Sequence, residues 1–225
     1  MRFRVLPWVA LALAVSAAGG ALAQILPKDA ADPIRVTHSK GEFAQKLNGL
    51  AMPTGKGWKA AMDSERLLQL MIPEKWKVEN VPSGELVLRA YPPGQEKKAK
   101  AVLQVTFTVP RDADPFSVDE DFAESYAEDL GQDPMFQRLQ YRVTDSGFVL
   151  ARGMKFALAG GILNSRGSRV QQEQLLYIAE DRIVSIHFTA EEKEFPKYAD
   201  DVAKIFASYH TLGVRKLTEE PPALP

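Results

Sequence analysis

The residue types that most often carry catalysis are scarce in this chain. Its 225 residues include three histidines, His38, His187 and His210, and no cysteine. A Ser-His-acid hydrolase needs a histidine that a serine can reach, and the G-x-S-x-G nucleophile motif does not occur. The histidines are not spaced as metal ligands. We therefore predict no catalytic residue, no metal site and no cofactor. We expect His187, the only histidine on a pattern that predicts burial, to be structural.

Carboxylates are the remaining candidates for chemistry. Six acidic residues gather between Asp112 and Glu124. A calcium loop places oxygen ligands at alternate positions around a glycine, whereas Pro115, Phe116 and Val118 interrupt that pattern here. The cluster fits a helix start better, because the helix dipole favours negative charge there. Paired carboxylates elsewhere could hydrolyse a glycosidic bond, so an envelope hydrolase stays open as an alternative function.

Three lysines, Lys97, Lys98 and Lys100, fall between two predicted strands. In one interpretation they are a solvated hairpin whose charges discourage edge pairing. In the other they are a docking point for an acidic partner. These lysines are the candidate partner-binding residues of the sequence.

Three aromatic residues, Trp58, Trp76 and Tyr91, suggest a different function, although their pattern favours core packing. A carrier could hold a small apolar ligand between a sheet and a helix, and it would need an apolar pocket of several hundred Å³. Gly160 and Gly161 predict a turn rather than a phosphate-binding loop, because no GKS or GKT follows them.

The first 23 residues have the three parts of a secretory signal peptide. A basic start precedes an apolar run over residues 5–15, and Ala-Leu-Ala ends the segment. This pattern predicts cleavage between Ala23 and Gln24, and a periplasmic or secreted protein. Residues 5–23 are uncharged and could instead stay as a membrane anchor, since about 20 residues span a bilayer. No second apolar run of that length occurs, so we expect no stable membrane insertion after cleavage.

Charge and cysteine content restrict the partners further. Loss of residues 1–23 removes two arginines and no acidic residue, so the net charge changes from −1 to −3. A nucleic-acid-binding protein would carry a strong positive excess instead. Without cysteine, neither disulfides nor a lipid anchor at the cleavage site can form. We expect a monomer that binds no nucleic acid.

The remaining chain divides into a linker, one domain and a tail. Residues 24–57 predict a linker with a short helix, which Ser39 and Glu42 would open as a capping box. Residues 58–213 predict an α+β domain, and residues 214–225 a flexible tail. Strands are predicted over residues 67–72, 76–81, 85–91, 101–109, 140–144, 148–158, 170–179 and 182–189, and helices over 117–130 and 196–209.

Two segments resemble the PsbP-like proteins. The segment LLQLMIPEKWKVEN at residues 67–80 is similar to the opening hairpin of this superfamily. The segment QQEQLLYIAEDRIVSIHFTAEEKEFPKYADDVAKIFASYH at residues 171–210 is similar to its closing strand-turn-strand-helix. The superfamily includes the extrinsic photosystem subunit, the Mog family linked to nuclear transport and the DcrB-like periplasmic proteins of bacteria.

The resemblance implies an antiparallel sheet flanked by helices, an α/β/α sandwich, and a function in binding rather than catalysis. No binding residue of the family can be carried over to this sequence. We expect a non-enzymatic exported protein that binds or supports another envelope protein or assembly. A small apolar-ligand carrier and a carboxylate-based envelope hydrolase are the alternatives.

Overall fold

A computed structural model of the chain describes residues 30–63, 68–81, 84–109, 118–165, 167–179 and 182–211. The predicted signal peptide, its cleavage site between Ala23 and Gln24, and the predicted tail over residues 214–225 lie outside the described residues. Within the described ranges, no helix is both long and apolar enough to cross a membrane.

The main sheet contains eight strands in the order β1-β7-β8-β9-β10-β6-β5-β4, and every neighbouring pair is antiparallel. Alternation along the central strands explains the sheet: Val184, Ile186 and Phe188 are buried, whereas the intervening Ser185 and His187 lie on the other face. The strands are β1 (Arg35–Lys40), β4 (Lys77–Asn80), β5 (Leu86–Tyr91), β6 (Ala101–Thr108), β7 (Arg142–Ala151), β8 (Met154–Ser165), β9 (Ser168–Ala179) and β10 (Arg182–Glu191).

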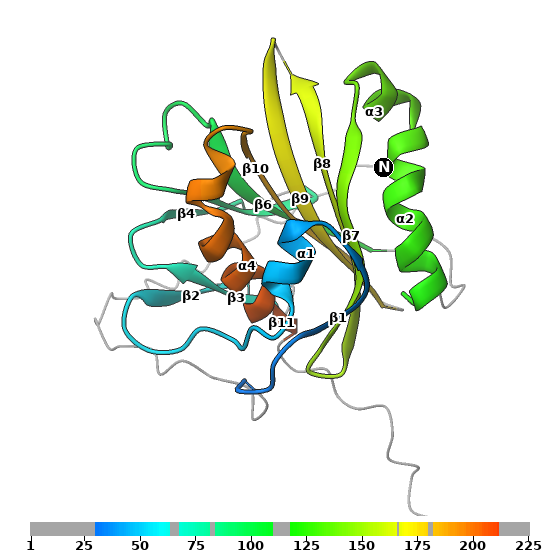
Figure 1. Ribbon diagram of the computed structural model, residues 1–225. Coiled ribbons are helices and arrows are strands. Elements are labelled where there is room, and N and C mark those ends of the chain that lie inside the picture. Colours follow the sequence, from blue (N-terminus) through cyan, green and yellow to red (C-terminus); the bar gives the residue numbers. More distant parts are fainter. Residues whose placement is uncertain are drawn as a thin grey trace, which may run out of the picture.

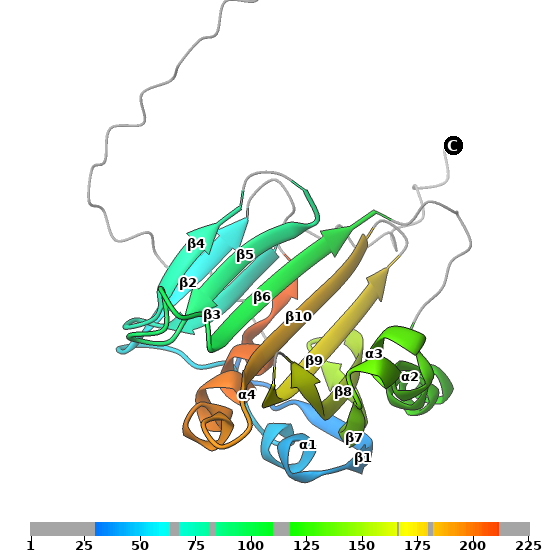
Figure 2. The same ribbon diagram turned by 90° about the horizontal axis from the view of Figure 1, so that it is seen from above.

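A small sheet and the helices complete the domain. Strands β11 (His210–Thr211), β3 (Leu68–Pro73) and β2 (Trp58–Asp63) pair in that order. The helices on one face of the main sheet are α1 (Glu42–Leu47), the 3₁₀ helix η1 (Phe195–Lys197) and α4 (Ala199–Ser208); those on the other face are α2 (Glu120–Gln132) and α3 (Pro134–Arg138) (Figures 1 and 2). The predicted α+β class, with an antiparallel sheet flanked by helices, is confirmed.

The main core lies between the large sheet, the small sheet, α1 and α4. Helix α4 buries the apolar stripe predicted for it, including Ile205 and Phe206. The ring of Phe206 meets Phe43 of α1 edge-on, with 5.6 Å between the ring centroids. This contact holds α1 beside α4.

The predicted linker is wrong for residues 35–40, which form β1, whereas the short helix predicted within it corresponds to α1. Strand β1 pairs with β7, and Phe43 and Leu47 are buried in the main core. Ser39 cannot cap α1 because it belongs to β1, and Gly41 occupies the N-cap position instead. The strand escaped prediction because it carries mostly polar, exposed residues at the edge of the sheet.

The predicted strand over residues 148–158 is wrong because a hairpin divides it. Arg152 and Gly153 form the turn between β7 and β8, both with positive φ, which suits a two-residue hairpin. The predicted turn at Gly160 and Gly161 is also wrong, since both lie inside β8. The turn that follows joins Ser165 to Ser168.

Helix α2 begins at Glu120, later than the helix predicted over residues 117–130. Its cap is Asp119, whose Oδ1 accepts the backbone N–H of Phe122 at 2.8 Å. The helix continues through Gly131 to Gln132. Asp119 therefore has the capping role that a helix start predicts, and Glu120 and Asp121 lie in the first turn of the helix.

Candidate ligand-binding pocket

The candidate partner-binding residues Lys97, Lys98 and Lys100 lie on the exposed loop between β5 and β6. Lys100 is paired: its Nζ lies 2.7 Å from Oε1 of Glu191 on β10. This hydrogen bond raises the pKa of Lys100 and lowers the pKa of Glu191. Lys100 therefore forms an ion pair with Glu191. Docking of an acidic protein at this loop stays a prediction.

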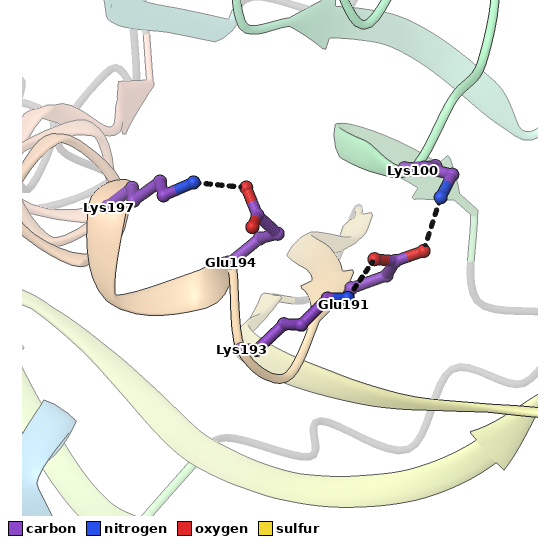
Figure 3. A network of polar contacts seen from close by, with 5 residues as sticks. All are labelled: Lys100, Glu191, Lys193, Glu194 and Lys197. Atoms are coloured by element: carbon purple, nitrogen blue, oxygen red, sulfur yellow. Dashed lines mark hydrogen bonds and ion pairs between the residues drawn. The ribbon is translucent and has the colours of Figure 1, made fainter.

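Opposite charges are interleaved around this loop. Figure 3 shows Lys193 also facing Glu191, at 4.0 Å, and Lys197 bonded to Glu194 at 2.5 Å. A hollow of about 310 Å³ opens next to them, where Arg169 pairs with Glu192 at 2.9 Å. Because basic and acidic side chains alternate here, the surface has no strong preference for one sign of partner charge. The hollow is lined by Lys100, Ser168, Arg169, Glu191, Glu192 and Lys193.

The aromatic residues that suggested a ligand carrier belong to the core. Trp76 is buried and packs against Phe188 and Tyr198, with centroid distances of 5.9 and 6.3 Å. Tyr91 is buried and Trp58 packs partly buried against the same core. These side chains stabilise the fold, and none of them lines the pocket beside α1 that is described below.

The histidines are divided between surface and interior. His187 is half-buried and its Nε2 lies 3.1 Å from Oε1 of Gln104, as expected of a structural histidine, and burial lowers its pKa. His38 is exposed and lies 3.4 Å from Glu120. His210 is also buried, contrary to expectation, because β11 pairs with β3. The described residues hold no cluster of three or more His, Cys, Asp or Glu suited to a metal ion. Asp112 and Asp114 lie outside them.

Sequence reasoning missed Asp145, a buried carboxylate on β7. Its Oδ1 accepts the backbone N–H groups of Phe43 at 2.8 Å and Ala44 at 3.2 Å. These donors are two of the first N–H groups of α1, which have no partner within the helix. A side chain about a hundred residues away in sequence therefore caps α1 and joins it to the sheet.

Glu173 of β9 is a second buried carboxylate on the same face of the sheet. Gly160 pairs with both Asp145 and Glu173, so one row across three strands holds them. A Cβ on Gly160 would lie 2.0 Å from Oε2 of Glu173, so only glycine leaves space for this carboxyl group. Burial, and secondarily the charge of Asp145, raises the pKa of Glu173 well above its ordinary value. Gln171 donates to Oε1 at 3.0 Å, which lowers that pKa in part.

A pocket of about 460 Å³ opens beside this row, between α1, η1, the start of α4 and strands β7 to β9. Figure 1 shows α1 in front of these strands, with α4 next to it. One part of the wall is apolar and includes the rings of Phe43 and Phe195, whose centroids lie 6.1 Å apart. The other part is polar and includes Asp145. The lining residues are Gly41, Glu42, Phe43, Lys46, Thr144, Asp145, Ile162, Gln171, Phe195, Pro196 and Ala199.

This arrangement is suited to binding more than to acid–base catalysis. A pair of catalytic carboxylates must both reach the substrate. Asp145 lines the pocket but uses Oδ1 to cap α1, and Glu173 is not among the lining residues. Asp145 thus contributes to the polar wall of the pocket, whereas Glu173 lies outside the lining.

A signal for Glu173 was present in the sequence. Along β9, Glu173, Leu175 and Tyr177 share one face, and the first two are buried. An acid in series with apolar residues indicates a buried carboxylate. Asp145 offered a weaker signal, because the strand shifts register near it.

Comparison with known proteins finds no matching protein family and no matching curated protein. The solved structures to which this chain is similar have 10–11% sequence identity with it. Cyanobacterial PsbP from Synechocystis sp. PCC 6803 aligns with 72% of this chain and 98% of its own, with a TM-score of 0.48. A protein from Bacteroides thetaiotaomicron aligns with 74% of this chain and 52% of its own, with a TM-score of 0.41. LpqN, involved in cell envelope biogenesis of Mycobacterium tuberculosis, aligns with 72% of this chain and 82% of its own, with a TM-score of 0.34.

At these identities and TM-scores the similarity carries no argument about function.

Proposed function

We propose that the protein is a non-enzymatic binding protein that acts after export and holds a small amphipathic ligand in the pocket between α1, η1 and the main sheet. The observation that carries this proposal is the pocket of about 460 Å³. Small-molecule sites have volumes of roughly 300–1,000 Å³, mostly apolar walls and a few polar groups that orient the ligand. Phe43, Ile162 and Phe195 supply the apolar wall, and Asp145 and Gln171 supply polar groups.

This is the carrier function that the sequence left open, at a different place from the aromatic residues that suggested it. The pocket is bounded by separate elements that the core holds together. Phe43 is fixed by α1 against Phe206, and Phe195 is fixed by η1 against Phe188. Such a preformed site loses little free energy to ordering when a ligand binds. Binding of an envelope protein through Lys97, Lys98 and Lys100 stays a separate prediction.

A blocked pocket tests the proposal. Ala199 lies in the first turn of α4 and lines the pocket, so Ala199→Trp should fill it. The probe is N-phenyl-1-naphthylamine, a neutral dye that fluoresces in apolar surroundings. We expect saturable binding to the wild type, and at least tenfold weaker binding to Ala199→Trp.

The matched control is Ala51→Trp, which adds the same ring at an exposed position outside the lining. It should bind the dye like the wild type. Urea unfolding of both variants checks that they are folded. Equal dye binding by Ala199→Trp and Ala51→Trp would show that the pocket is not the binding site.

A further inference from the structure

The pocket has an unbalanced negative charge. Glu42 stands exposed at its rim, and Asp145 is buried in its wall. Within the described residues neither carboxylate forms an ion pair with a basic side chain. In a partly desolvated wall such a charge acts more strongly than it does in water.

The one basic residue of the lining is already engaged. Lys46 of α1 forms an ion pair with Asp200 of α4. That contact lowers the pKa of Asp200, first through the hydrogen bond and then through the charge of Lys46. The pair spans the rim without neutralising Glu42 or Asp145, so an anionic ligand would meet two carboxylates and no free ammonium group on the lining.

Asp145 has one oxygen to offer a ligand. Oδ1 accepts the two N–H groups of α1, whereas Oδ2 accepts no hydrogen bond within the described part of the chain. Glu173, behind it, has an Oε2 atom that is buried and accepts no hydrogen bond there either. A donor entering the pocket would therefore find an acceptor in Oδ2 of Asp145, beside the hydroxyl of Thr144, which also lines the pocket and has no hydrogen-bond partner within the described residues.

The apolar wall fits the other part of such a ligand. Phe43 and Phe195 present two rings at 70° to each other. Aromatic rings attract cations at their faces and pack apolar groups against the rest of their surface. The wall and the carboxylates are contiguous on one lining, so a single small molecule could contact both.

We propose that the ligand of this pocket is a small organic cation, with an ammonium or guanidinium group at Asp145 and Glu42 and an apolar or aromatic part against Phe43 and Phe195. This inference rests on the proposed function and adds the chemical class of the ligand. Charge complementarity supplies the selectivity, because neutral and anionic molecules of the same shape lose the contact with the carboxylates.

Three probes of matched shape test the charge. These are 2-phenylethylammonium, 2-phenylethanol and 3-phenylpropanoate, titrated into the full mature chain by calorimetry at low salt. We expect the ammonium probe to bind at least tenfold tighter than the alcohol, and the propanoate to bind weakest. Glu42→Gln should weaken the ammonium probe severalfold and leave the alcohol unchanged. Glu128→Gln, the same change on exposed α2, should alter neither.

The outcomes separate the two proposals. If the alcohol or the propanoate binds as tightly as the ammonium probe, and Ala199→Trp abolishes binding, the pocket stands and the cation class is overturned. If Glu42→Gln weakens all three probes equally, the charge contact is also overturned. If no probe binds saturably, or Ala199→Trp binds them all like the wild type, the proposed function itself fails.

Discussion

The buried carboxyl group of Glu173 should make the folded protein sensitive to pH in a way that one substitution removes. Burial, followed by the charge of Asp145, raises the pKa of Glu173 well above its ordinary value. The unfolded chain ionises this group near pH 4.3, about the usual glutamate value. The folded chain keeps the proton to higher pH. The stability linked to Glu173 is therefore fully present below the unfolded pKa and is lost as pH rises through the folded pKa.

The magnitude follows from the linkage. Within the window between the two pKa values, each pH unit removes about 1.4 kcal/mol of stability. Glu173→Gln keeps the shape of the side chain and an oxygen that can accept from Gln171, but it cannot ionise. Above the unfolded pKa the variant should therefore gain stability relative to the wild type as pH rises, until the folded pKa of Glu173 is passed.

Urea unfolding at half-unit steps between pH 4 and pH 8 measures this difference. Other titrating groups affect both proteins, so the difference isolates position 173. The matched control is Glu128→Gln on exposed α2, for which we expect a flat difference. A flat difference for Glu173→Gln as well, or a variant that loses stability with rising pH relative to the wild type, would refute the reasoning.

Four further predictions follow from the same contacts. Asp145→Ala should cost about 2–3 kcal/mol in urea unfolding, because two N–H groups of α1 lose a charged acceptor, and Asp145→Asn should cost less because its amide oxygen can still accept. Gly160→Ala should lower the free energy of unfolding by about 1–3 kcal/mol, because its Cβ would be forced against Glu173. Gly131→Ala on α2, where a Cβ would lie 3.5 Å from its nearest neighbour, should instead raise it by about 0.5–1 kcal/mol. Equal effects of the two substitutions would contradict the close contact between Gly160 and Glu173. Replacing Lys97, Lys98 and Lys100 with glutamate should leave stability nearly unchanged and slow the capture of an acidic envelope partner in crosslinking assays at low salt; unchanged yields at low and moderate salt would remove this loop from the binding surface. The intact mass of the protein from its native host should correspond to a chain that starts at Gln24, and a chain that retains residues 1–23 would contradict export with cleavage.

Much of the fold follows from local patterns. Alternation along β6 and β10 predicts both strands, because each has one mostly buried face and one mostly polar face. The stripe on α4 is equally legible, since Ile205 and Phe206 recur at helical spacing. These elements lie in the centre of the molecule, where burial imposes the pattern.

The errors fall where the decisive contact is distant in sequence. The cap of α1 comes from Asp145, 102 residues away from Phe43, so no local motif could reveal it. Gly160 looks like a turn residue until Glu173 is seen to fill the space above it. The pocket is lined by residues of α1, η1, α4 and three strands that are distant in sequence, so no local pattern predicts it, although the buried acid of β9 is visible in the alternation.

The measurement that tests the central claim most directly is an NMR titration of the ¹⁵N-labelled mature protein with 2-phenylethylammonium and N-phenyl-1-naphthylamine. The claim is that the space between α1, η1 and the sheet binds small amphipathic molecules. It predicts saturable shifts of the amide signals of Phe43, Asp145, Phe195 and Ala199 for both probes, with little change at Trp76. Shifts that centre on other residues, or that never saturate, would contradict it.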